Sequence, residues 1–510
     1  MNISGIGQLN NSEFDYLKEI RGQIEQLKLQ LASGKKATTY GKLGSERGIV
    51  INFRQELSQI TSYQSSIQVV DVRLNLMETN LKRISEMGIE GRGEIEPNSF
   101  LLQENGKVHA QVSSEMMMKE MIGLLNGDVA GRQMFSGQSV HTKPVVSFDE
   151  MILGANGKAG LKTVTDERLV ADLGPVNAAP LPTSMGRLTA SAAGASTVTI
   201  SRGYPPSHEF GMRIKSISEG LSNATLTQNG TAGDYDDFSI AFTGQPTANE
   251  GITVAFELPD GSTATTQLSA TANSPPGKYK FTIGGTPTQT ADNFRTALID
   301  EIGSFTKQEL PAASNVRAAT DFFTTANGTA PKRVTGGADP NATSLIDGTT
   351  ANTVSWYAGD NGTTVSSRNT AQGRVDSSIN VNYGVRANEK PFSKQLAMFG
   401  ALTIQTFTNS DDEKDRYFEL ANRVREGLFR EIGDPNIDSI RTELSVAHKA
   451  ANNAKIRHTQ TSGMLEGLRD GIEGVVLEEV AISLLTLQTR LQASFLATAR
   501  INELSLANYL

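Results

Sequence analysis

Residues 477–510 constrain the fold more than any other part of this sequence. Large apolar residues recur there at alternating steps of three and four, the spacing that forms one seam along a helix. The seam consists of Leu477, Val480, Leu484, Leu487 and Leu491, continues less regularly through Phe495 and Ile501, and reaches Leu504 and Leu510. Because one helix cannot bury its own seam, this stretch requires a helical partner.

A matching seam lies near the other end of the sequence, at Leu17, Ile20, Ile24, Leu27 and Leu31. Two such seams, separated by most of the chain, predict a terminal coiled coil in a polymerising subunit rather than an enzyme. An uncovered seam does not offset the entropy of ordering a free helix, so we expect disordered ends in the monomer. The alternative is a closed bundle whose ends pack within one monomer.

The composition excludes several classes of protein. A net charge of −8 provides no basic field for nucleic acid. The absence of cysteine excludes disulfides, thiolate metal sites and cysteine nucleophiles. The first residues lack the basic and apolar regions of a cleavable signal peptide, and no apolar run reaches membrane-spanning length. At 510 residues the chain predicts several domains.

The period of the apolar residues divides the chain into helical and β-rich parts. Helices are predicted over 12–33, from Ile51 onward, over 99–126 and again after Pro391. Between about residues 140 and 390 the period falls to two, which indicates strands.

Within this middle part three features are specific. The sequence Pro259-Asp260-Gly261 predicts a hairpin turn, residues 290–305 predict one short helix, and residues 374–385 predict a final strand. The fold is therefore multidomain α+β, with long terminal helices around a β-rich insert. The predicted parts are a terminal coiled-coil layer (1–45 and 475–510), a helical bundle (46–140 and 391–474) and a solvent-facing insert (141–390).

Residues that could carry chemistry favour simpler interpretations. His208-Glu209 begins like a zinc-protease motif, but Met212 occupies the place of the second histidine. His458 lies on a helical seam, where a packed histidine is the simpler interpretation. Asp234, Asp236 and Asp237 lack the glycine and glutamate of a calcium loop. We therefore expect no catalysis, no metal and no cofactor.

Three segments resemble the bacterial flagellin superfamily, which contains filament subunits and hook–filament junction proteins (hook-associated proteins). Residues 31–36 (LASGKK) are similar to the segment that follows the first helix in that family. Residues 126–137 (NGDVAGRQMFSG) resemble its N-x4-G-x-Y-(L/I)-F-(S/A)-G motif through Asn126, Gly131, Phe135, Ser136 and Gly137. The ending 504–510 (LSLANYL) is most similar to the close of the junction proteins. Residues 40–44 replace the family's acidic segment.

The resemblance implies an architecture and partners. Paired terminal helices would form the inner layer of a polymer, a helical bundle would surround it, and the insert would face solvent. Such proteins are exported unfolded by the flagellar type III apparatus and become extracellular. The implied partners are other copies in a helical or ring assembly, the hook-side adaptor, flagellin, and an export chaperone at the C-terminal helix, with no nucleic acid and no membrane insertion.

Three functions remain open on the sequence. The leading expectation is a structural adaptor between flagellar hook and filament, and its rival is a flagellin that forms the filament itself. A surface adhesin or glycan-binding module ranks lower, because the insert shows no cluster of aromatic residues of the kind on which sugars stack. A metalloprotease ranks lowest, for want of the second histidine.

Overall fold

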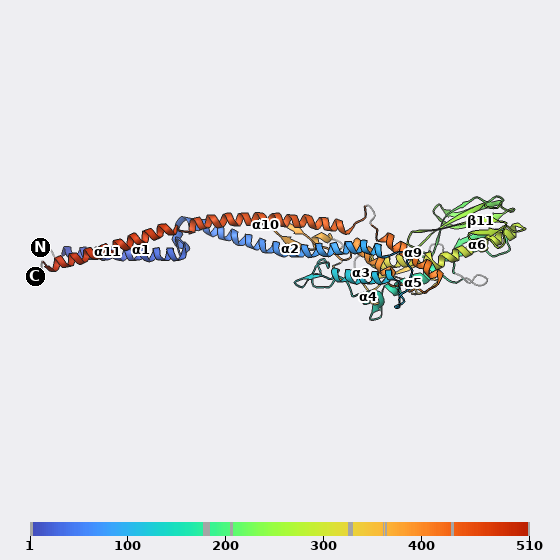
Figure 1. Cartoon of the computed structure of the whole chain (residues 1–510), viewed down its shortest axis with the longest axis horizontal. Helices are drawn as coiled ribbons and strands as arrows, with labels where there is room; N and C mark the ends of the chain where they lie inside the picture. Colours follow the sequence, from blue (N-terminus) through green and yellow to red (C-terminus); the bar gives the residue numbers. More distant parts are fainter. Residues whose placement is uncertain are drawn as a thin grey trace. The chain divides into compact units, whose positions relative to one another are not determined.

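The computed structural model describes residues 4–176, 184–203, 208–324, 330–360, 362, 365–429 and 433–507, with only the backbone of 4–13 and 501–507. Long helices and a β-sheet confirm the predicted mixture of the two (Figure 1). The chain forms two compact units. The first contains the described residues up to Asp71, Gly373–Val381 and those from His448 onward, and the second contains those of Val72–Gln372 and Asn382–Ala447. The predicted division into three layers stays a prediction.

The first unit consists mainly of long helices. Figure 1 shows α1 (Ser4–Ser33) and α11 (Leu477–Ala507) side by side and antiparallel. The short 3-10 helix η1 (Tyr40–Glu46) leads into α2 (Arg47–Glu94), and the last part of α10 (Ile437–Glu473) precedes α11.

Inside the first unit the early part of α2 packs against the late part of α10. The Tyr63 ring stacks on His458 with 5.4 Å between ring centroids. Ile60 and Ile67 of α2 are buried, as are Ala451 and Ala454 of α10. Because the alanine side chain is small, these positions of α10 allow the two helices to approach closely.

Gly34 ends α1 as the sequence predicts. Its φ of +66° lies in the left-handed region, and its N–H donates to the carbonyl of Gln30 at 2.8 Å. Glycine adopts this conformation without the penalty that a Cβ brings, which makes it the usual helix stop.

The predicted strand over 374–385 is wrong as a single element. The structure forms a hairpin instead, in which β15 (Gln372–Arg374) pairs with β16 (Asn380–Asn382). The Val375 N–H donates to the Ile379 carbonyl at 3.0 Å, and the Asp376 carboxylate accepts the Ser377 N–H. The Asp-Ser-Ser sequence thus turns the chain where alternation alone predicted extension.

In the second unit, helices α3 (His109–Leu125), α8 (Lys390–Thr403) and α9 (Asp411–Gly427) pack together with the later part of α2. The prediction that the third helix starts at residue 99 is wrong by ten residues. Gly106, with φ +74°, donates its N–H to Gln103 at 2.9 Å and closes a tight turn that delays the helix.

The β-sheet of the second unit is mostly antiparallel, in the order β12-β11-β10-β7-β9-β6-β5, with β8 paired to β9. The predicted hairpin at residues 259–261 is confirmed, because Glu257 pairs with Thr263 and the Leu258 N–H donates to the Ser262 carbonyl. The strands are β5 (Leu188–Ala190), β6 (Thr197–Arg202), β7 (Arg213–Glu219), β8 (Ala224–Thr231), β9 (Asp234–Phe242), β10 (Gly251–Glu257), β11 (Thr263–Thr271) and β12 (Lys280–Thr282).

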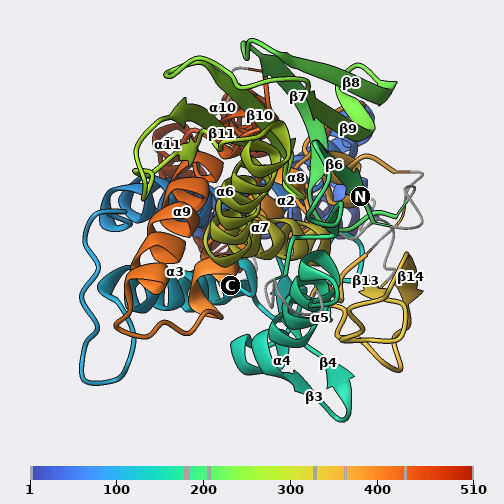
Figure 2. The same cartoon turned by 90° about the vertical axis from the view of Figure 1, so that its right-hand side faces the viewer.

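Helix α6 (Pro287–Lys307) covers one face of this sheet (Figure 2). Alternate residues of β9, namely Phe238, Ile240 and Phe242, are buried against it. The ring of Phe294 meets that of Phe242 edge-on at 5.7 Å between centroids. The period of two in the sequence therefore identifies the residues of this core correctly.

The middle of the chain contains more helix than the sequence predicts. Helix α7 (Glu309–Phe323) packs against α5 (Leu161–Leu173), α8 and α9. The insert is therefore β-rich only in part, and its helices share the core of the second unit. The remaining short elements are β1 (Asp128–Val129), β2 (Arg132–Gln133), α4 (Phe148–Leu153), β3 (Gly154–Ala155), β4 (Lys158–Ala159), β13 (Ala330–Val334), β14 (Leu345–Gly348) and η2 (Ser367–Thr370).

Candidate functional site

A cluster of contacts ties α1 and α11 together where the two helices meet the rest of the first unit. The Val475 N–H donates to the Gly34 carbonyl at 3.1 Å, and the Lys36 N–H donates to the backbone carbonyl of Glu473 at 2.7 Å. The Arg54 guanidinium donates to both carboxylate oxygens of Glu473 at 2.7 Å. Two backbone bonds therefore join the segment after α1 to the segment before α11, and beside them one ion pair joins α2 to the last residue of α10.

The charge of Glu473 is maintained despite burial. Burial opposes the ionised form, but the hydrogen bonds and charge of Arg54, with a smaller effect of Lys35, outweigh it and lower the pKa of Glu473. Burial alone would raise the pKa of Glu473, so the net lowering shows that the two cations more than compensate for burial.

The predicted N-terminal seam turns toward α11 in its middle. Ile20 and Ile24 are buried, Leu17 and Leu27 are half-buried, and Leu31 at the end of the helix is exposed. The alternating spacing of three and four residues thus places one stripe of α1 against α11. Burial in this stripe is lowest at Leu31, near Gly34.

The predicted C-terminal seam is buried unevenly. Val480 is buried, and Leu484, Leu487 and Leu491 are half-buried. Leu477 is exposed. Phe495 is 52% exposed, because the half-buried row continues through Ser494 and Thr498 instead. Ile501 and Leu504 lie on α11 with only their backbone described, and Leu510 lies outside the described residues.

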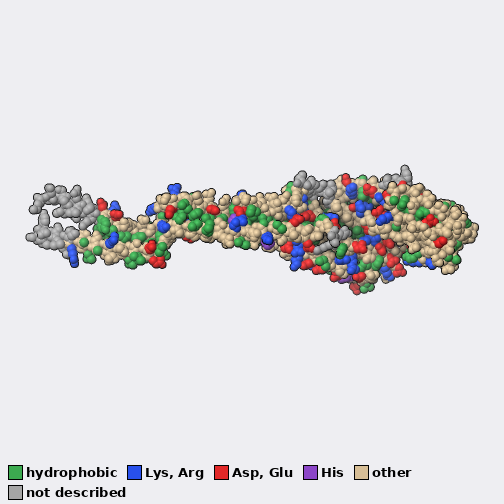
Figure 3. Space-filling view, turned by 90° about the horizontal axis from the view of Figure 1, so that it is seen from above, with side chains coloured by type: hydrophobic (Ala, Val, Ile, Leu, Met, Phe, Trp, Pro, Cys, Tyr) green, Lys and Arg blue, Asp and Glu red, His purple; other side chains and the backbone are tan. Residues whose placement is uncertain are grey.

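Further apolar side chains of α1 and α11, here called the second apolar face, are exposed in the described part of these helices. Phe14 of α1 is 72% exposed, and Ile482 and Leu485 of α11 are 65% and 63% exposed. Figure 3 shows hydrophobic side chains at the surface along this helical part. Exposed apolar groups gathered on one element are typical of interaction surfaces. Tyr16, Leu29 and Leu496 are also exposed, and so are Leu31, Leu477 and Phe495, which belong to the predicted seams.

The segment that resembles the family motif is folded around its matching residues. The Asn126 side chain donates to the Val145 carbonyl at 2.9 Å and accepts the Val145 N–H at 3.0 Å. Gly131 has a φ of +76°, and its N–H donates to Asp128. Phe135 is fully buried and meets Phe392 of α8 edge-on. Each of these residues has a structural task in the fold.

The end of the motif marks the place where the chain leaves the helical part and returns to it. The Ala387 N–H donates to the Phe135 carbonyl, and the Asp360 N–H donates to the Ser136 carbonyl, both at 2.8 Å. Gly137 has a φ of +64°, and a Cβ there would lie 3.0 Å from the Cβ of Asp360. Glycine is therefore required at this crossing both by conformation and by space.

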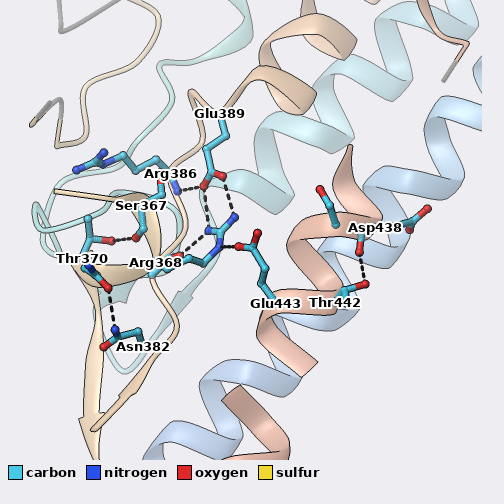
Figure 4. A network of polar contacts seen from close by, with 12 residues as sticks. Ser367, Arg368, Thr370, Asn382, Arg386, Glu389, Asp438, Thr442 and Glu443 are labelled. Atoms are coloured by element: carbon cyan, nitrogen blue, oxygen red, sulfur yellow. Dashed lines mark hydrogen bonds and ion pairs between the residues drawn. The ribbon is translucent and has the colours of Figure 1, made fainter. Parts of the chain in front are cut away.

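An arginine network fastens the returning segment to α10 (Figure 4). Arg368 of η2 donates to both carboxylate oxygens of Glu389, at 3.1 and 2.9 Å, and also to Glu443 of α10. Glu389 in turn accepts the Arg386 N–H at 2.9 Å. Burial alone would lower the pKa of Arg368, but the two carboxylates raise it. The Arg368 guanidinium therefore stays charged, and the network holds the segment through ion pairs rather than acting as a titrating site.

The histidines that the sequence singled out are placed in the core. His208 is almost fully buried, and burial together with the charges of Arg187 and Arg202 lowers its pKa to about 4. His458 lies 2.8 Å from the Val375 carbonyl through Nε2. Asp234 is paired with Arg202 at 2.9 Å. His458 and Asp234 thus each have a structural partner, and the lowered pKa of His208 favours its neutral form.

Among the residues that the structure describes, no group of three or more histidine and acidic side chains is placed to hold a metal ion. None of the described helices is long and apolar enough to cross a membrane. The expectations of no metal, no cofactor and no membrane insertion stay predictions.

A polar cleft of about 630 Å³ in the second unit was not predicted. It lies beside the β10–β11 turn and α7, and both signs of charge line it, including Arg213, Glu257, Asp260, Arg317 and Asp347. Its volume falls in the range of ligand pockets, but the mixed charges select no class of ligand.

A comparison of the sequence with protein-family models and with curated protein sequences returned no match.

Proposed function

We propose that this chain is a structural subunit of the bacterial flagellum that acts as an adaptor at the hook–filament junction and assembles through its terminal helices. The observation that carries the proposal is the second apolar face of α1 and α11, which stays exposed although the two helices already pack together. The three segments that resemble the flagellin superfamily support the same assignment. In this proposal α1 and α11 form the inner layer, the other helices form a bundle around it, and the insert faces solvent.

Burial of the exposed face would favour association. Full burial of a leucine or isoleucine side chain contributes roughly 1.5–3 kcal/mol. Ile482 and Leu485 together would therefore supply several kcal/mol before the cost of ordering. A contact between unlike surfaces of successive copies does not close on itself and builds a ring or a helical tube.

The family resemblance implies the partners that this face would bind. Before assembly an export chaperone would cover the C-terminal helix, because an exposed apolar face invites aggregation. After export, the same face would bind other copies, the hook-side adaptor and flagellin.

A filament-forming flagellin is the second candidate. Residues 40–44, where the family's acidic segment is missing, fold into η1, and the Arg54 guanidinium lies 5.3 Å from the Tyr40 ring centroid. The departure from the family pattern is thus an ordered part of the first unit.

Electron microscopy of purified protein, seeded with and without hook fragments, tests the proposal. We expect a short ring or cap at hook ends and no long filaments. Long filaments of this protein alone would favour the second candidate, and no assembly under either condition would refute both.

A matched pair of variants tests the assembly face itself. The double substitution Ile482→Asp with Leu485→Asp should abolish incorporation, while circular dichroism shows unchanged helix content. Ser483→Asp places one negative charge at a neighbouring exposed position of α11 and should incorporate normally. Normal incorporation of the double variant would remove the assembly face from the proposal.

A further inference from the structure

A cavity of about 300 Å³ lies in the helical part of the second unit, between α2, α8, the end of α9 and the start of α10. Its volume is at the lower end of the range that ligand pockets span. The residues that line it are mainly apolar and include Ile89, Pro391, Leu428, Phe429, Pro435 and Ile437. The cavity can therefore hold a small apolar group, and it shares no lining residue with the polar cleft.

The apolar lining is only partly covered by the chain itself. Ile437 at the start of α10 is buried, but Ile89 of α2 is 66% exposed and Phe429, just after α9, is 51% exposed. A ligand that covered these two side chains would remove apolar surface from water, which favours binding. The cavity thus joins a buried apolar residue to two exposed ones.

A glycine leaves the space beside α2 open. Gly88 lines the cavity, and a Cβ there would lie 3.4 Å from Oε1 of Gln395. Gln395 of α8 is buried, and its Nε2 donates to the Ile84 carbonyl at 3.0 Å. The amide beside Gly88 is therefore held in place, and any larger residue at position 88 would occupy part of the cavity.

The charged groups at the cavity favour an anion. Arg92, Lys394 and Asp434 line it. Asp434 is already paired, with Lys390 at 2.9 Å and with Lys394 at 3.6 Å. The Arg92 guanidinium lies 4.5 Å from the Phe429 ring centroid and has no ion pair among the described residues. One carboxylate thus lies among three cations, and Arg92 is available to a negative group on a ligand.

We propose that this cavity binds a short aliphatic carboxylate. Its hydrocarbon chain lies against Ile89, Leu428 and Ile437, and its carboxylate pairs with Arg92. An aliphatic chain fits better than an aromatic ring because most of the apolar lining residues are aliphatic. The site does not depend on the proposed assembly role, since it lies in the second unit and the assembly face lies on α1 and α11.

Titration of the full chain with octanoate, followed by methyl NMR, tests the site. The δ-methyl resonances of Ile89 and Ile437 should shift and saturate. The resonance of Ile482 serves as the reference for adsorption to exposed apolar surface, because Ile482 is equally exposed but lies on the second apolar face. Each buried CH₂ group changes affinity about fourfold, so hexanoate should bind about 15-fold more weakly than octanoate.

Probes of equal chain length separate the charge from the chain. Neutral octanol should bind about fivefold more weakly than octanoate, the factor expected for a solvent-screened ion pair. Cationic octylamine should bind more weakly still. Equal affinity for octanoate and octylamine would overturn the proposal. Parallel, unsaturated shifts at Ile89 and Ile482, or no shift at Ile89 and Ile437 below the concentration at which octanoate forms micelles, would overturn it as well.

Three variants locate the binding site. Arg92→Met keeps an unbranched side chain but removes the charge, so the preference for octanoate over octanol should disappear while octanol binds as before. Ile89→Asp should weaken octanoate binding at least tenfold, observed at Ile437. Val446→Asp is the matched control, because Val446 of α10 is 67% exposed and does not line the cavity. Unchanged octanoate binding in Ile89→Asp, or an equal loss in Val446→Asp, would refute the site.

Discussion

Replacing Glu473 by glutamine should loosen the end of α10 from α2, next to the two backbone bonds that join the segments after α1 and before α11. The substitution keeps the size of the side chain but removes the charge that Arg54 and Lys35 share. Hydrogen bonds to charged groups contribute about 1.5–3 kcal/mol each in favourable settings. The Arg54 side chain is 40% exposed while that of Glu473 is 8% exposed, so solvent screening reduces the expected coupling to about 1 kcal/mol.

The assay is local hydrogen exchange at the two backbone bonds beside the ion pair. A loss of about 1 kcal/mol should accelerate exchange of the Lys36 and Val475 amides about fivefold, since 1.4 kcal/mol corresponds to a factor of ten. A double-mutant cycle of Arg54→Met with Glu473→Gln isolates the pair.

A matched control comes from Lys35, which is half exposed and lies 3.5 Å from Glu473. The cycle of Lys35→Met with Glu473→Gln should show coupling near zero. If the Arg54 cycle also gave no coupling, the ion pair would not stabilise this junction, and the backbone bonds alone would have to hold it.

The pH dependence of the same pair has a definite sign. The folded pKa of Glu473 is lowered, so its contribution is complete above the unfolded value of about 4.5 and is lost as pH falls through the folded value. Exchange at Lys36 and Val475, corrected for the intrinsic effect of pH, should therefore accelerate on acidification in the wild type and change less in Glu473→Gln.

Three other predictions concern the second unit. Phe294→Ala should lower its free energy of unfolding in urea by about 3–5 kcal/mol, because the ring is fully buried against Phe242, whereas exposed Thr296→Ala should change it little. Gly137→Ala should cost about 1–3 kcal/mol in the same assay owing to its positive φ, while Gly123→Ala, in open space on α3, should stabilise slightly; an unchanged Gly137→Ala protein would refute the crossing geometry. The raised pKa of Glu309 predicts that its own contribution to stability falls as pH rises from about 4.5 to about 7; because His208 and other groups titrate in both proteins, the check is the difference between the wild-type and Glu309→Gln profiles, which should show this fall.

Periodic patterns predicted the parts of the fold in which one face is buried and the other is not. The seams at both ends correspond to long helices, and the alternation in β9 correctly identifies its buried residues. Turn residues were equally informative at 259–261, where proline, aspartate and glycine close the β10–β11 hairpin. In each case a local rule of geometry and a global pattern of burial agree.

Helix α7 shows why other parts escaped prediction. Its sequence contains a proline in the first turn and several small residues, including Ala312, Ala313 and Ser314, that are buried because neighbouring helices surround them. A helix that is buried on several sides lacks the contrast from which a period of 3.6 is recognised. The ion pair between Arg423 and Asp260 was unpredictable for a different reason. The two residues lie 163 positions apart in sequence, and only the tertiary fold brings them together.

The terminal helices have two apolar surfaces, one for pairing with each other and one available to other copies, and the sequence pattern alone does not distinguish them. Ile20, Ile24 and Val480 are already buried within the chain, so another copy could reach them only if α1 and α11 came apart. Ile482 and Leu485 are available without such a separation. Amide exchange of the free protein distinguishes the two routes. Protected amides in α1 and α11 would mean that assembly adds copies to a preformed pair through the exposed face. Unprotected amides would mean that pairing and assembly occur together, and that both faces contribute to the same step.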